Sequence, residues 1–375
     1  MLDRARLSFL LSVLLALGLF SHPVASRADW RADWEKTLAA AKAEGNIWVY
    51  GPPGLQYINA IETFKTVYPD IKMVYVPGSG SQHSNRMSAE RRAGKFLADA
   101  FISGSGTGGI LAEKGFFDPL PPQLILPENT DQSLWFRKQH LYADPGKAFI
   151  IMQGNVTATI AAYNTQKHKP GELKSFQGLL DLKWRGKMVS FDPLGRGALQ
   201  LWKGLYYNKN LGPEFIYRLF SEMDVTIGRD FRVAVDWVAS GKYELFIAAR
   251  DTEVGDAMKK GLPIDLYRAP ADEGYLSGGF GHLGSMNRAP HPNAARVFVN
   301  WMLSKEGQLA WQAKSDNNSL RMDISKDMLT DKFIIPEADG GYLVPSLPEY
   351  QDVSGLRKIL AKAKAGAAKR YGKGR

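Results

Sequence analysis

A glycine-rich turn is the first feature of the sequence whose residue types and spacing could do chemistry. The segment "SGSGTGG", residues 103–109, places Gly104, Gly106 and Gly109 at the G-x-G-x-x-G spacing of a dinucleotide-binding turn. A nucleotide site also needs a full helix after the glycines, then a second strand that ends in an acidic residue. Here the expected helix covers 109–114 at most, and a proline-rich stretch follows it. We therefore predict that this turn does not bind a nucleotide.

Motifs for catalysis or metal binding are not found elsewhere in the sequence. It contains no G-x-x-x-x-G-K-[ST] phosphate loop, no G-x-S-x-G nucleophile turn and no H-E-x-x-H metal motif. The six histidines are scattered, and the acidic segments show no paired-carboxylate spacing. We expect no enzymatic activity, no catalytic residue, no metal and no cofactor.

Two arginines lie in turns that suit a ligand better than a reaction. Arg196 and Gly197 belong to "PLGRGA", and Arg250 and Asp251 belong to "AARDT". A guanidinium in such a turn can hold a carboxylate, phosphate or phosphonate with two hydrogen bonds. The alternative is a surface arginine paired with a neighbouring aspartate, and both interpretations stay open.

Hydroxyl side chains occupy two further turns in the first third of the chain. They are Ser79, Ser81, Ser103, Ser105 and Thr107. Each can donate a hydrogen bond to an anion, or can serve only as a helix N-cap. We include all five among the candidate ligand-binding residues.

These residues must be positioned by elements that alternate between β-rich runs and amphipathic helical stretches. The alternation predicts an α/β fold with largely parallel sheets. Strand-to-helix turns with small, polar residues are expected at 51–54, 78–81, 103–108, 192–197 and 249–252. In such a fold these turns lie at the carboxyl edge of the strands, where backbone N–H groups and the helix dipole favour an anion. The sequence therefore predicts two lobes that face each other across a cleft.

Two longer segments give more specific expectations. The apolar residues of "HPNAARVFVNWMLSKEGQLAWQ", residues 291–312, recur on one helical face, which predicts a single long helix. The runs at 147–154 and 157–164 are predicted to be strands that carry the chain into the second lobe.

The N-terminus has the organisation of a secretory signal peptide. Arg4 and Arg6 precede the apolar run "LSFLLSVLLALGLF", and the small-residue pattern "VASRA" follows, so we expect cleavage after Ala25 or Ala28. The chain contains no cysteine, which excludes disulfides, thiolate metal sites and a lipid anchor at the cleavage site. The mature protein is expected to be soluble in the periplasm.

The formal net charge of +10 is confined to the two ends of the chain. Residues 1–28 carry three arginines and one aspartate, and the segment from Gly355 onward carries eight lysines and arginines without an acid. The remaining residues, 29–354, are close to neutral, which argues against nucleic-acid binding. We expect the basic tail to be a solvated helix end and not a polyanion-binding arm.

Three segments together resemble a known family. They are "YPDIKMVYVPGSGS", "AAYNTQKHKPGELKSFQGLLDLKWRGKMVSFDP" and "NRAPHPNAARVFVNWMLSKEGQ". The chain resembles the type II periplasmic solute-binding proteins of ABC importers over about residues 32–330, and is most similar to the ferric-ion-binding-like subgroup. The resemblance implies two α/β lobes with mixed sheets flanked by helices, joined by a pair of crossover strands and closing on the ligand about a hinge.

The same resemblance implies the organisation of the chain and its partners. We expect the signal peptide at 1–28, lobe 1 at 29–150, lobe 2 at 151–265, a return to lobe 1 at 266–345 and the basic tail at 346–375. The protein is expected to be a monomer that delivers a small-molecule ligand to the permease subunits in the inner membrane. A sensory role for the loaded form stays open.

One departure from the family pattern bears on the ligand. Members that hold ferric iron place two adjacent tyrosines just after the strand that corresponds to "YELFIAA", where this sequence has Arg250, Asp251 and Thr252. Because ferric iron prefers anionic oxygen ligands and an arginine would repel it, we expect a small anionic solute such as a phosphonate, phosphate ester or carboxylate. The alternative is ferric iron or an iron chelate held with a synergistic anion. Tyr275, in "ADEGYLSGG", is expected to line the cleft where the chain returns to lobe 1.

Overall fold

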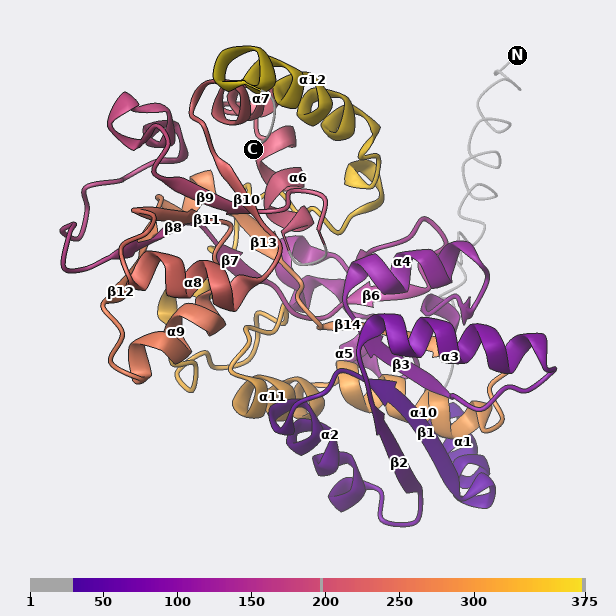
Figure 1. Cartoon of the computed structure of the whole chain (residues 1–375). Helices are drawn as coiled ribbons and strands as arrows, with labels where there is room; N and C mark the ends of the chain where they lie inside the picture. The colour runs from indigo at the N-terminus through magenta and orange to yellow at the C-terminus, as the bar shows by residue number, and fades with distance from the viewer. Residues whose placement is uncertain (1–29, 196–197, 373–375) are drawn as a thin grey trace, which may run out of the picture.

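Seven strands form the sheet of lobe 1 in the computed structural model, which describes residues 30–195 and 198–372 (Figure 1). The order is β2-β1-β3-β14-β6-β5, with β4 paired to β14. The strands are β1 (Asn46–Gly51), β2 (Lys72–Pro77), β3 (Ala100–Ser103), β4 (Phe117–Asp118), β5 (Leu141–Tyr142), β6 (Phe149–Ile151) and β14 (His282–Met286). Strands β1, β2 and β3 are parallel, and β14 runs antiparallel to β3. The lobe therefore has the mixed sheet that the family resemblance implies, whereas the largely parallel sheet expected from the alternation of strands and helices is confined to β1, β2 and β3.

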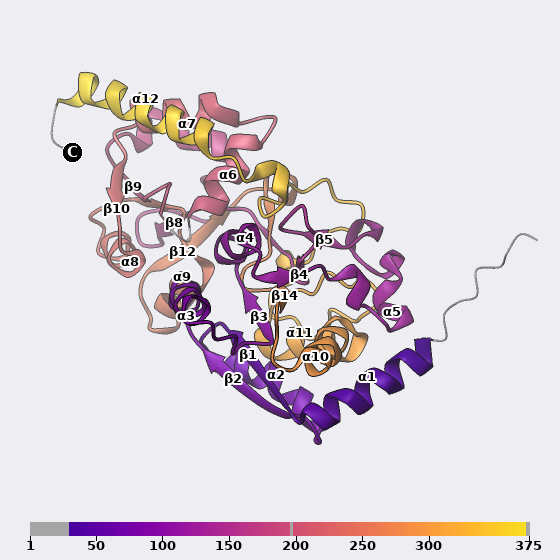
Figure 2. The same cartoon turned by 90° about the vertical axis from the view of Figure 1, so that its right-hand side faces the viewer.

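Helices cover both faces of this sheet (Figure 2). They are α1 (Trp30–Glu44), α2 (Leu55–Val67), α3 (Gly80–Arg92), α4 (Ser105–Glu113), α5 (Pro127–Thr130), α10 (Pro292–Leu303) and α11 (Lys305–Ser315). The expectation of one long helix over 291–312 is wrong, because α10 ends at Leu303 and a separate helix, α11, begins at Lys305. Ser304 adopts an extended conformation there, and its side chain accepts a hydrogen bond from the N–H of Gly307. An N-cap residue thus begins a second helix in the middle of the apolar pattern.

Lobe 2 has a five-stranded sheet of order β10-β9-β11-β8-β12. Its strands are β8 (Thr159–Asn164), β9 (Met188–Phe191), β10 (Thr226–Gly228), β11 (Leu245–Ile247) and β12 (Ile264–Arg268). Its helices are α6 (Leu199–Tyr207), α7 (Gly212–Glu222), α8 (Phe231–Ala239) and α9 (Asp251–Lys259). Strands β9, β10 and β11 are parallel, and β8 runs antiparallel to both of its neighbours, β11 and β12. Each lobe encloses its own hydrophobic core.

Two short strands connect the lobes. β7 (Asn155–Thr157) leads from lobe 1 into β8, and β13 (Tyr275–Ser277) leads back into β14; the two pair antiparallel. This is the pair of crossover strands that the family resemblance implies. The crossover itself occupies β7, so the expectation that 157–164 carries the chain across is wrong for most of its length, since β8 belongs to the sheet of lobe 2.

The C-terminal segment returns to lobe 2 along the hinge. Leu343 forms a bridge beside Tyr275, and its carbonyl oxygen accepts the N–H of Leu276 at 2.8 Å. The chain then forms α12 (Ser354–Tyr371), which packs on α7. α12 and α1 lie at opposite ends of the molecule in both views (Figures 1 and 2). Most of the basic segment is therefore a helix attached to lobe 2.

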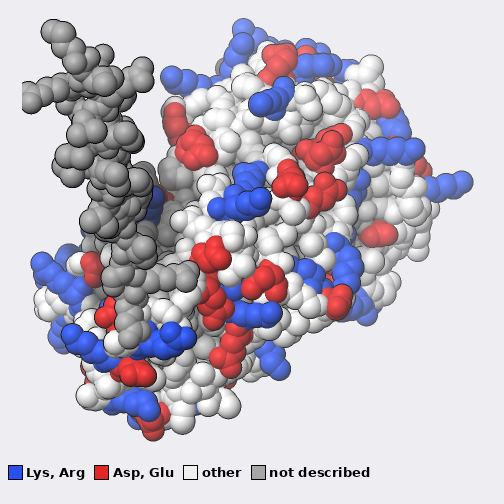
Figure 3. Space-filling model, turned by 180° about the vertical axis from the view of Figure 1, so that it is seen from behind, with Lys and Arg blue, Asp and Glu red and all other residues white. Residues whose placement is uncertain are grey.

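Surface charge on the rear face is mixed, with blue and red side chains interspersed (Figure 3). This distribution agrees with the near-neutral charge of the chain between its two ends. Among residues 30–195 and 198–372, no helix has the length and apolar content needed to cross a membrane. The segment expected to be a signal peptide lies outside the described residues.

Candidate functional site

Three of the expected turns lie together at one edge of the lobe 1 sheet. Because β1, β2 and β3 are parallel, their carboxyl ends at Gly51, Pro77 and Ser103 meet there. The turns also touch one another: a β-carbon at Gly80 would overlap the Oγ1 of Thr107 and lie 3.3 Å from the Oγ of Ser103. Glycine at position 80 is what allows this approach, so the structure brings the two hydroxyl-bearing turns into contact.

The hydroxyls of these turns differ in how they are engaged. Ser79 is the N-cap of α3, and its Oγ accepts the N–H of Gln82 at 3.3 Å and lies 3.2 Å from the Oγ of Ser81. Ser103 ends β3 and is buried, and Ser105 is the buried first residue of α4. The N-cap of α4 is Gly104, which offers no side-chain cap to the first N–H groups of that helix. Capping by a serine therefore occurs at α3 and not at α4.

The corresponding edge of lobe 2 carries Arg250. β9, β10 and β11 end together at Phe191, Gly228 and Ile247, and the turn at 249–252 follows β11. The Arg250 guanidinium carbon lies 3.7 Å from the ring centroid of Phe231, which is stacked on Phe191 at 3.8 Å. This stack fixes the guanidinium on an aromatic face at the end of the sheet.

Arg250 also has an acidic neighbour, but a different one from the aspartate considered above. Its Nη1 lies 2.9 Å from the Oε1 of Glu253, one helical turn further along α9, and the arginine side chain is 41% exposed. The guanidinium has five N–H donors, so an ion pair with one carboxylate oxygen leaves it able to bind a second acceptor. Arg250 can therefore bind an anionic ligand while it keeps its ion pair with Glu253.

Asp251 lies in a network within lobe 2. Its Oδ1 accepts the hydroxyl of Thr159 at 2.8 Å, and its Oδ2 lies 3.1 Å from the Nη2 of Arg268. Arg268 in turn pairs with Asp331 at 3.0 Å. Since both carboxylate oxygens are engaged, this side chain connects α9 to β8 and β12, and it is committed to contacts inside the protein.

Tyr275 lies at the base of the hinge. It is buried on β13, and a β-carbon at Gly204 of α6 would lie 3.2 Å from its ring. Burial raises the pKa of the phenol above its ordinary value, and the nearby negative charge of Asp251 raises it further. The side chain is therefore a neutral hydroxyl at physiological pH.

A hydrogen bond connects the carboxyl edge of the lobe 1 sheet to that of the lobe 2 sheet. The Nε2 of Gln200, in the first turn of α6, donates to the Oγ of Ser105 at 2.9 Å. This contact joins the helix that follows the 192–197 turn of lobe 2 to the helix that follows the 103–108 turn of lobe 1. The candidate residues Arg196 and Gly197 lie outside the described residues, immediately before α6.

Sequence reasoning missed two turns at the same edges. The turn after β10 carries Arg229, which is exposed, and the turn before β14 carries Phe280 between glycines. Phe280 is 40% exposed, and its ring centroid lies 5.7 Å from that of Tyr57. The turn that carries it also lies close to Gly104, through the carbonyl oxygen of Gly279. The pattern "SGGFGH" contains the available signal, because an aromatic residue flanked by glycines is exposed on a tight turn.

His282 lies at the same edge of the lobe 1 sheet, at the start of β14. It pairs with Ser103 across β14 and β3, and its ring is buried against Phe149 at a centroid distance of 5.6 Å. Burial lowers its pKa to about 3. The imidazole is therefore neutral at physiological pH and adds no charge to the edge.

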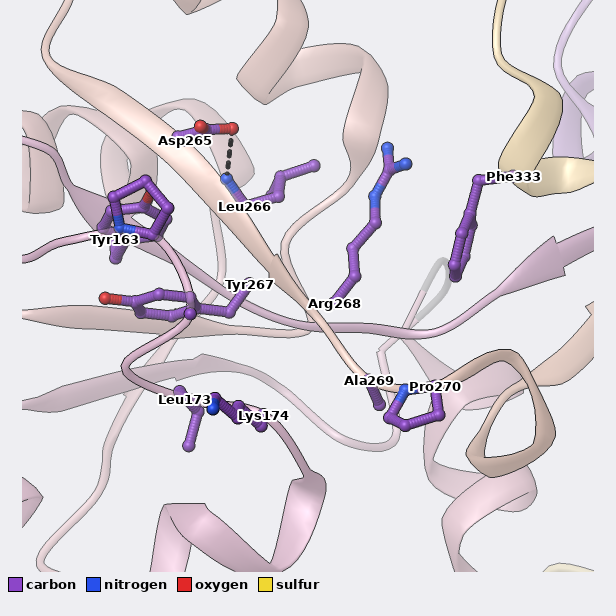
Figure 4. A pocket seen from close by; sticks show the side chains of 12 residues that line it. Tyr163, Leu173, Lys174, Asp265, Leu266, Tyr267, Arg268, Ala269, Pro270 and Phe333 are labelled. Carbon is purple, nitrogen blue, oxygen red and sulfur yellow. Dashed lines mark hydrogen bonds between the residues drawn. The ribbon is translucent and has the colours of Figure 1, made fainter.

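A separate surface cavity of about 390 Å³ opens beside β12 (Figure 4). Figure 4 shows Arg268 extending from the strand with Phe333 across from it, and the rings of Tyr163 and Tyr267 at the other end. Arg268 lines the cavity, and its ion pair with Asp251 connects the cavity to the 249–252 turn. The cavity belongs to the outer edge of lobe 2. Within the described ranges, no cluster of three or more histidine, cysteine, aspartate or glutamate side chains could hold a metal ion.

The family of the chain follows from a match to a family model. The model of bacterial extracellular solute-binding proteins matches residues 51–309, more than half of the sequence, so the chain belongs to that family. It is the substrate-binding component of an ABC importer, a class of transport proteins without enzymatic activity. No curated protein matches the sequence.

Solved structures of type II periplasmic binding proteins share the fold. Iron-bound HitA from Pseudomonas aeruginosa has 19% identity and a TM-score of 0.58, over 86% of this chain and 99% of its own. The Trichodesmium IdiA (FutA) protein, in complex with iron and citrate, has 16% identity and a TM-score of 0.62 over 88% and 100%. AfuA from Actinobacillus pleuropneumoniae, with fructose-6-phosphate bound, has 15% identity and a TM-score of 0.59 over 85% and 97%. These similarities confirm the two-lobe α/β fold.

Proposed function

We propose that this protein captures a small solute with an anionic group between its two lobes and delivers it, in the closed form, to a permease. The observation that carries the proposal is the position of Arg250, at the carboxyl edge of the lobe 2 sheet and stacked on Phe231 at 3.7 Å. An arginine held on an aromatic face keeps its planar donors oriented, so it binds a carboxylate or phosphate with little loss of side-chain freedom.

Lobe 1 supplies the complementary donors. The first turn of α4 has no side-chain cap, and Ser103 and Thr107 lie against Gly80 in the adjacent turn. Backbone N–H groups at a helix N-terminus bind anions, and the glycines allow a ligand to approach them closely. In this proposal Ser79, Ser81 and Ser105 shape the turns around the ligand, and Arg196, Gly197 and Tyr275 complete its surroundings from lobe 2 and the hinge.

The bound solutes of the structural neighbours define the alternatives. AfuA holds fructose-6-phosphate, whereas HitA and the Trichodesmium protein hold iron, the latter with citrate. A phosphate ester or carboxylate suits an arginine in the 249–252 turn, and ferric iron does not unless a synergistic anion lies between them. The proposal therefore favours the anionic organic solute over the metal.

Titration calorimetry with a defined panel tests the proposal. The probes are fructose 6-phosphate, orthophosphate, methylphosphonate, citrate and ferric citrate, and we expect saturable binding of at least one iron-free anion. Arg250→Gln should weaken that binding by roughly 10- to 100-fold, because a hydrogen bond to a charged group contributes about 1.5–3 kcal/mol. Binding of ferric citrate alone, with visible charge-transfer colour, would assign the protein to the iron receptors instead.

The chain offers a matched control for that substitution. Arg218 on α7 also pairs with a glutamate one turn away, Glu222, at 3.4 Å. Arg218→Gln removes the same charge and the same kind of ion pair at a distance from the turns. It should leave the affinity unchanged, and an equal loss in both variants would contradict the assignment of Arg250 to the site.

The N-terminal sequence supports a proposal for the localisation of the protein. We propose that the protein is a monomer secreted into the periplasm, with its signal peptide removed by cleavage after Ala25 or Ala28. Mass spectrometry of the exported protein should give an N-terminus at Ser26 or Asp29.

A further inference from the structure

Helix α12 carries a set of cations that the fold does not explain. Six basic side chains lie along its 18 residues, with no acidic residue among them, and all six are exposed. They are Arg357, Lys358, Lys362, Lys364, Lys369 and Arg370. We refer to them as the α12 basic face.

The opposite side of α12 holds the helix on lobe 2. Leu356 and Ala363 are buried, and the Tyr371 hydroxyl donates to the carbonyl oxygen of Glu222 at the end of α7. At 100° per residue, Lys358, Lys362 and Lys369 lie opposite these contacts. Arg357 and Lys364 lie on the flank next to Tyr371, and Arg370 lies near Ala363. Alanines fill the spaces between them, at 361, 365 and 368. The α12 basic face is thus a broad strip over about half of the helix circumference, with no bulky side chain between the cations.

The cations have little compensation within the protein. In the part of the chain that the structure describes, none of the six lies within 4.0 Å of a carboxylate oxygen. Lys362 lies over the ring of Tyr217 at 4.9 Å, and Asp352, just before the helix, is bound by Ser354. Lys358 and Lys362 are four residues apart, a spacing at which like charges destabilise a helix. The charges of Lys358 and Lys362 therefore destabilise α12, whereas Lys369 and Arg370 in the last turn have the sign that the helix dipole favours.

In place of the solvated helix end expected from the sequence, we infer that the α12 basic face docks the protein on a surface of anionic phospholipid. Clusters of four to eight lysines and arginines on an exposed helix bind anionic lipids through their summed charge, without specific contacts. With about 1.5 Å of rise per residue, α12 presents a straight strip roughly 27 Å long, which fits a flat charged plane. An importer component works beside a membrane, and such a plane is available there.

The composition of the strip favours a lipid surface over a protein or a nucleic acid. Protein interfaces are enriched in aromatic residues and arginine and depleted in lysine. On the α12 basic face lysine predominates, and the exposed positions between the cations are alanines. Single-stranded nucleic acid would need aromatic side chains for base stacking, and none interrupts the strip.

The position of α12 is compatible with ligand capture. The helix lies on the outside of lobe 2, beyond α7 (Figures 1 and 2). The turns at 78–81 and 103–108 belong to the other lobe. Docking through α12 would keep the protein near the membrane and leave the space between the lobes accessible to solute.

Vesicle co-sedimentation of the mature protein tests this inference. The two lipid mixtures are pure phosphatidylcholine and phosphatidylcholine with about 30% phosphatidylglycerol, each at about 0.05 M and 0.3 M salt. We expect binding to the anionic vesicles at low salt, weakened at high salt, and none to the neutral ones. The absence of binding to anionic vesicles at low salt would overturn the inference.

Two triple variants with the same change of charge separate the α12 basic face from general electrostatics. Lys358→Gln, Lys364→Gln and Lys369→Gln together should lower the partition coefficient roughly 100-fold, at about a factor of 5 per charge. The control changes Lys36, Lys95 and Lys114, three exposed lysines of lobe 1, to glutamine and should change the coefficient less than about 3-fold. Equal losses in both variants would overturn the inference.

A protein partner is the remaining outcome. If wild-type protein binds neutral vesicles only when they contain the permease, and the α12 variant loses that binding, the face is a protein interface and the lipid assignment is wrong. Thermal unfolding of both triple variants, with melting temperatures close to wild type, confirms that the comparison is made on folded protein.

Discussion

Gln200 of lobe 2 donates a hydrogen bond of 2.9 Å from its Nε2 to the Oγ of Ser105 of lobe 1. Each residue lies in the first turn of the helix that follows a glycine-rich turn, α6 in lobe 2 and α4 in lobe 1. The contact therefore lies where the two carboxyl edges approach, and it depends on how far the lobes are closed. We refer to this contact as the latch and expect it to stabilise the closed arrangement of the lobes about the hinge formed by β7 and β13.

Removal of the latch should shift the protein toward a more open form. A neutral hydrogen bond contributes about 1 kcal/mol, so Gln200→Ala should increase the ratio of open to closed molecules roughly fivefold. Because the chain contains no cysteine, spin labels can be placed at Lys95→Cys in lobe 1 and Lys259→Cys in lobe 2, and the distance distribution measured. The control Gln166→Ala changes an exposed glutamine of lobe 2. An unchanged distribution in Gln200→Ala would show that the latch does not hold the lobes.

The glycines of "SGSGTGG" should respond unequally to alanine. A β-carbon at Gly108 would overlap the ring of Phe149, which is stacked on Phe117 in the lobe 1 core, whereas one at Gly109 would meet nothing within 4 Å. Gly108→Ala should therefore cost about 1–3 kcal/mol of unfolding free energy through overpacking. Gly109→Ala should add about 0.5–1 kcal/mol, because alanine favours a helix more than glycine does.

Urea denaturation of the two variants measures both effects in one experiment. The comparison also bears on the G-x-G-x-x-G spacing, since Gly109 belongs to that pattern and Gly108 does not. Equal destabilisation by both substitutions would mean that α4 is not packed on β6 as the structure has it.

The strand-to-helix turns could be predicted from sequence because local chemistry determines them. Short runs such as "NIWVYG" and "KMVYVP" became parallel strands, and the small residues after them had to lie at the carboxyl edge of the sheet. The start of α4 could not be predicted in the same way. Three of its first five residues are glycines, which have a low helix propensity, so the expected helix began at 109 and the observed one begins at Ser105. Packing of Gly108 on Phe149 outweighs that local preference.

For the candidate residues too, the sequence predicts positions along the chain but not the contacts that they make. Sequence placed Arg250 in a turn at the end of a strand, but its partner depends on helix geometry. Glu253 is three residues further on and lies on the same side of α9, whereas Asp251 points toward Thr159 and Arg268. The pairing of Gln200 with Ser105 joins residues 95 positions apart, and no local pattern indicates such a contact.

Stability should fall in mild acid because three histidines, His83, His140 and His282, are buried and burial lowers the pKa of each ring. Burial lowers the pKa of His282 to about 3 and that of His140 to about 4, where the positive charge of Arg321 contributes as well. In the unfolded chain all three titrate near 6.5, so protons bind the unfolded state first as the pH falls. The unfolding free energy should therefore decrease below about pH 6.5 and continue to decrease until the folded pKa values are reached.

Urea denaturation at pH 7 and pH 5 measures this loss. At pH 5 His140 and His282 should each account for about 2 kcal/mol. His140→Gln should reduce the difference between the two pH values by about 2 kcal/mol. A free energy that is the same at pH 7 and pH 5 would mean that these rings are not buried in their neutral form.

The stack of Arg250 on Phe231 should appear as a coupling energy. A guanidinium over an aromatic face at a partly exposed site contributes about 0.5–1 kcal/mol beyond the contributions of the two side chains alone. Arg250→Gln and Phe231→Leu, singly and together, form a double-mutant cycle in which the coupling is the non-additive part of the change in unfolding free energy. Arg250→Gln with Val233→Ala forms the control cycle, because Val233 is an exposed residue of the same helix α8.

That coupling has a consequence for ligand capture. If Phe231 holds the guanidinium in place, Phe231→Leu should weaken the binding of the iron-free anion found by calorimetry, because more side-chain freedom is then lost on binding. In the Arg250→Gln background the same substitution should have no further effect on affinity. A loss that persists in that background would mean that Phe231 contacts the solute directly, and the lobe 2 part of the site would then include the aromatic pair of Phe231 and Phe191 as well as the arginine.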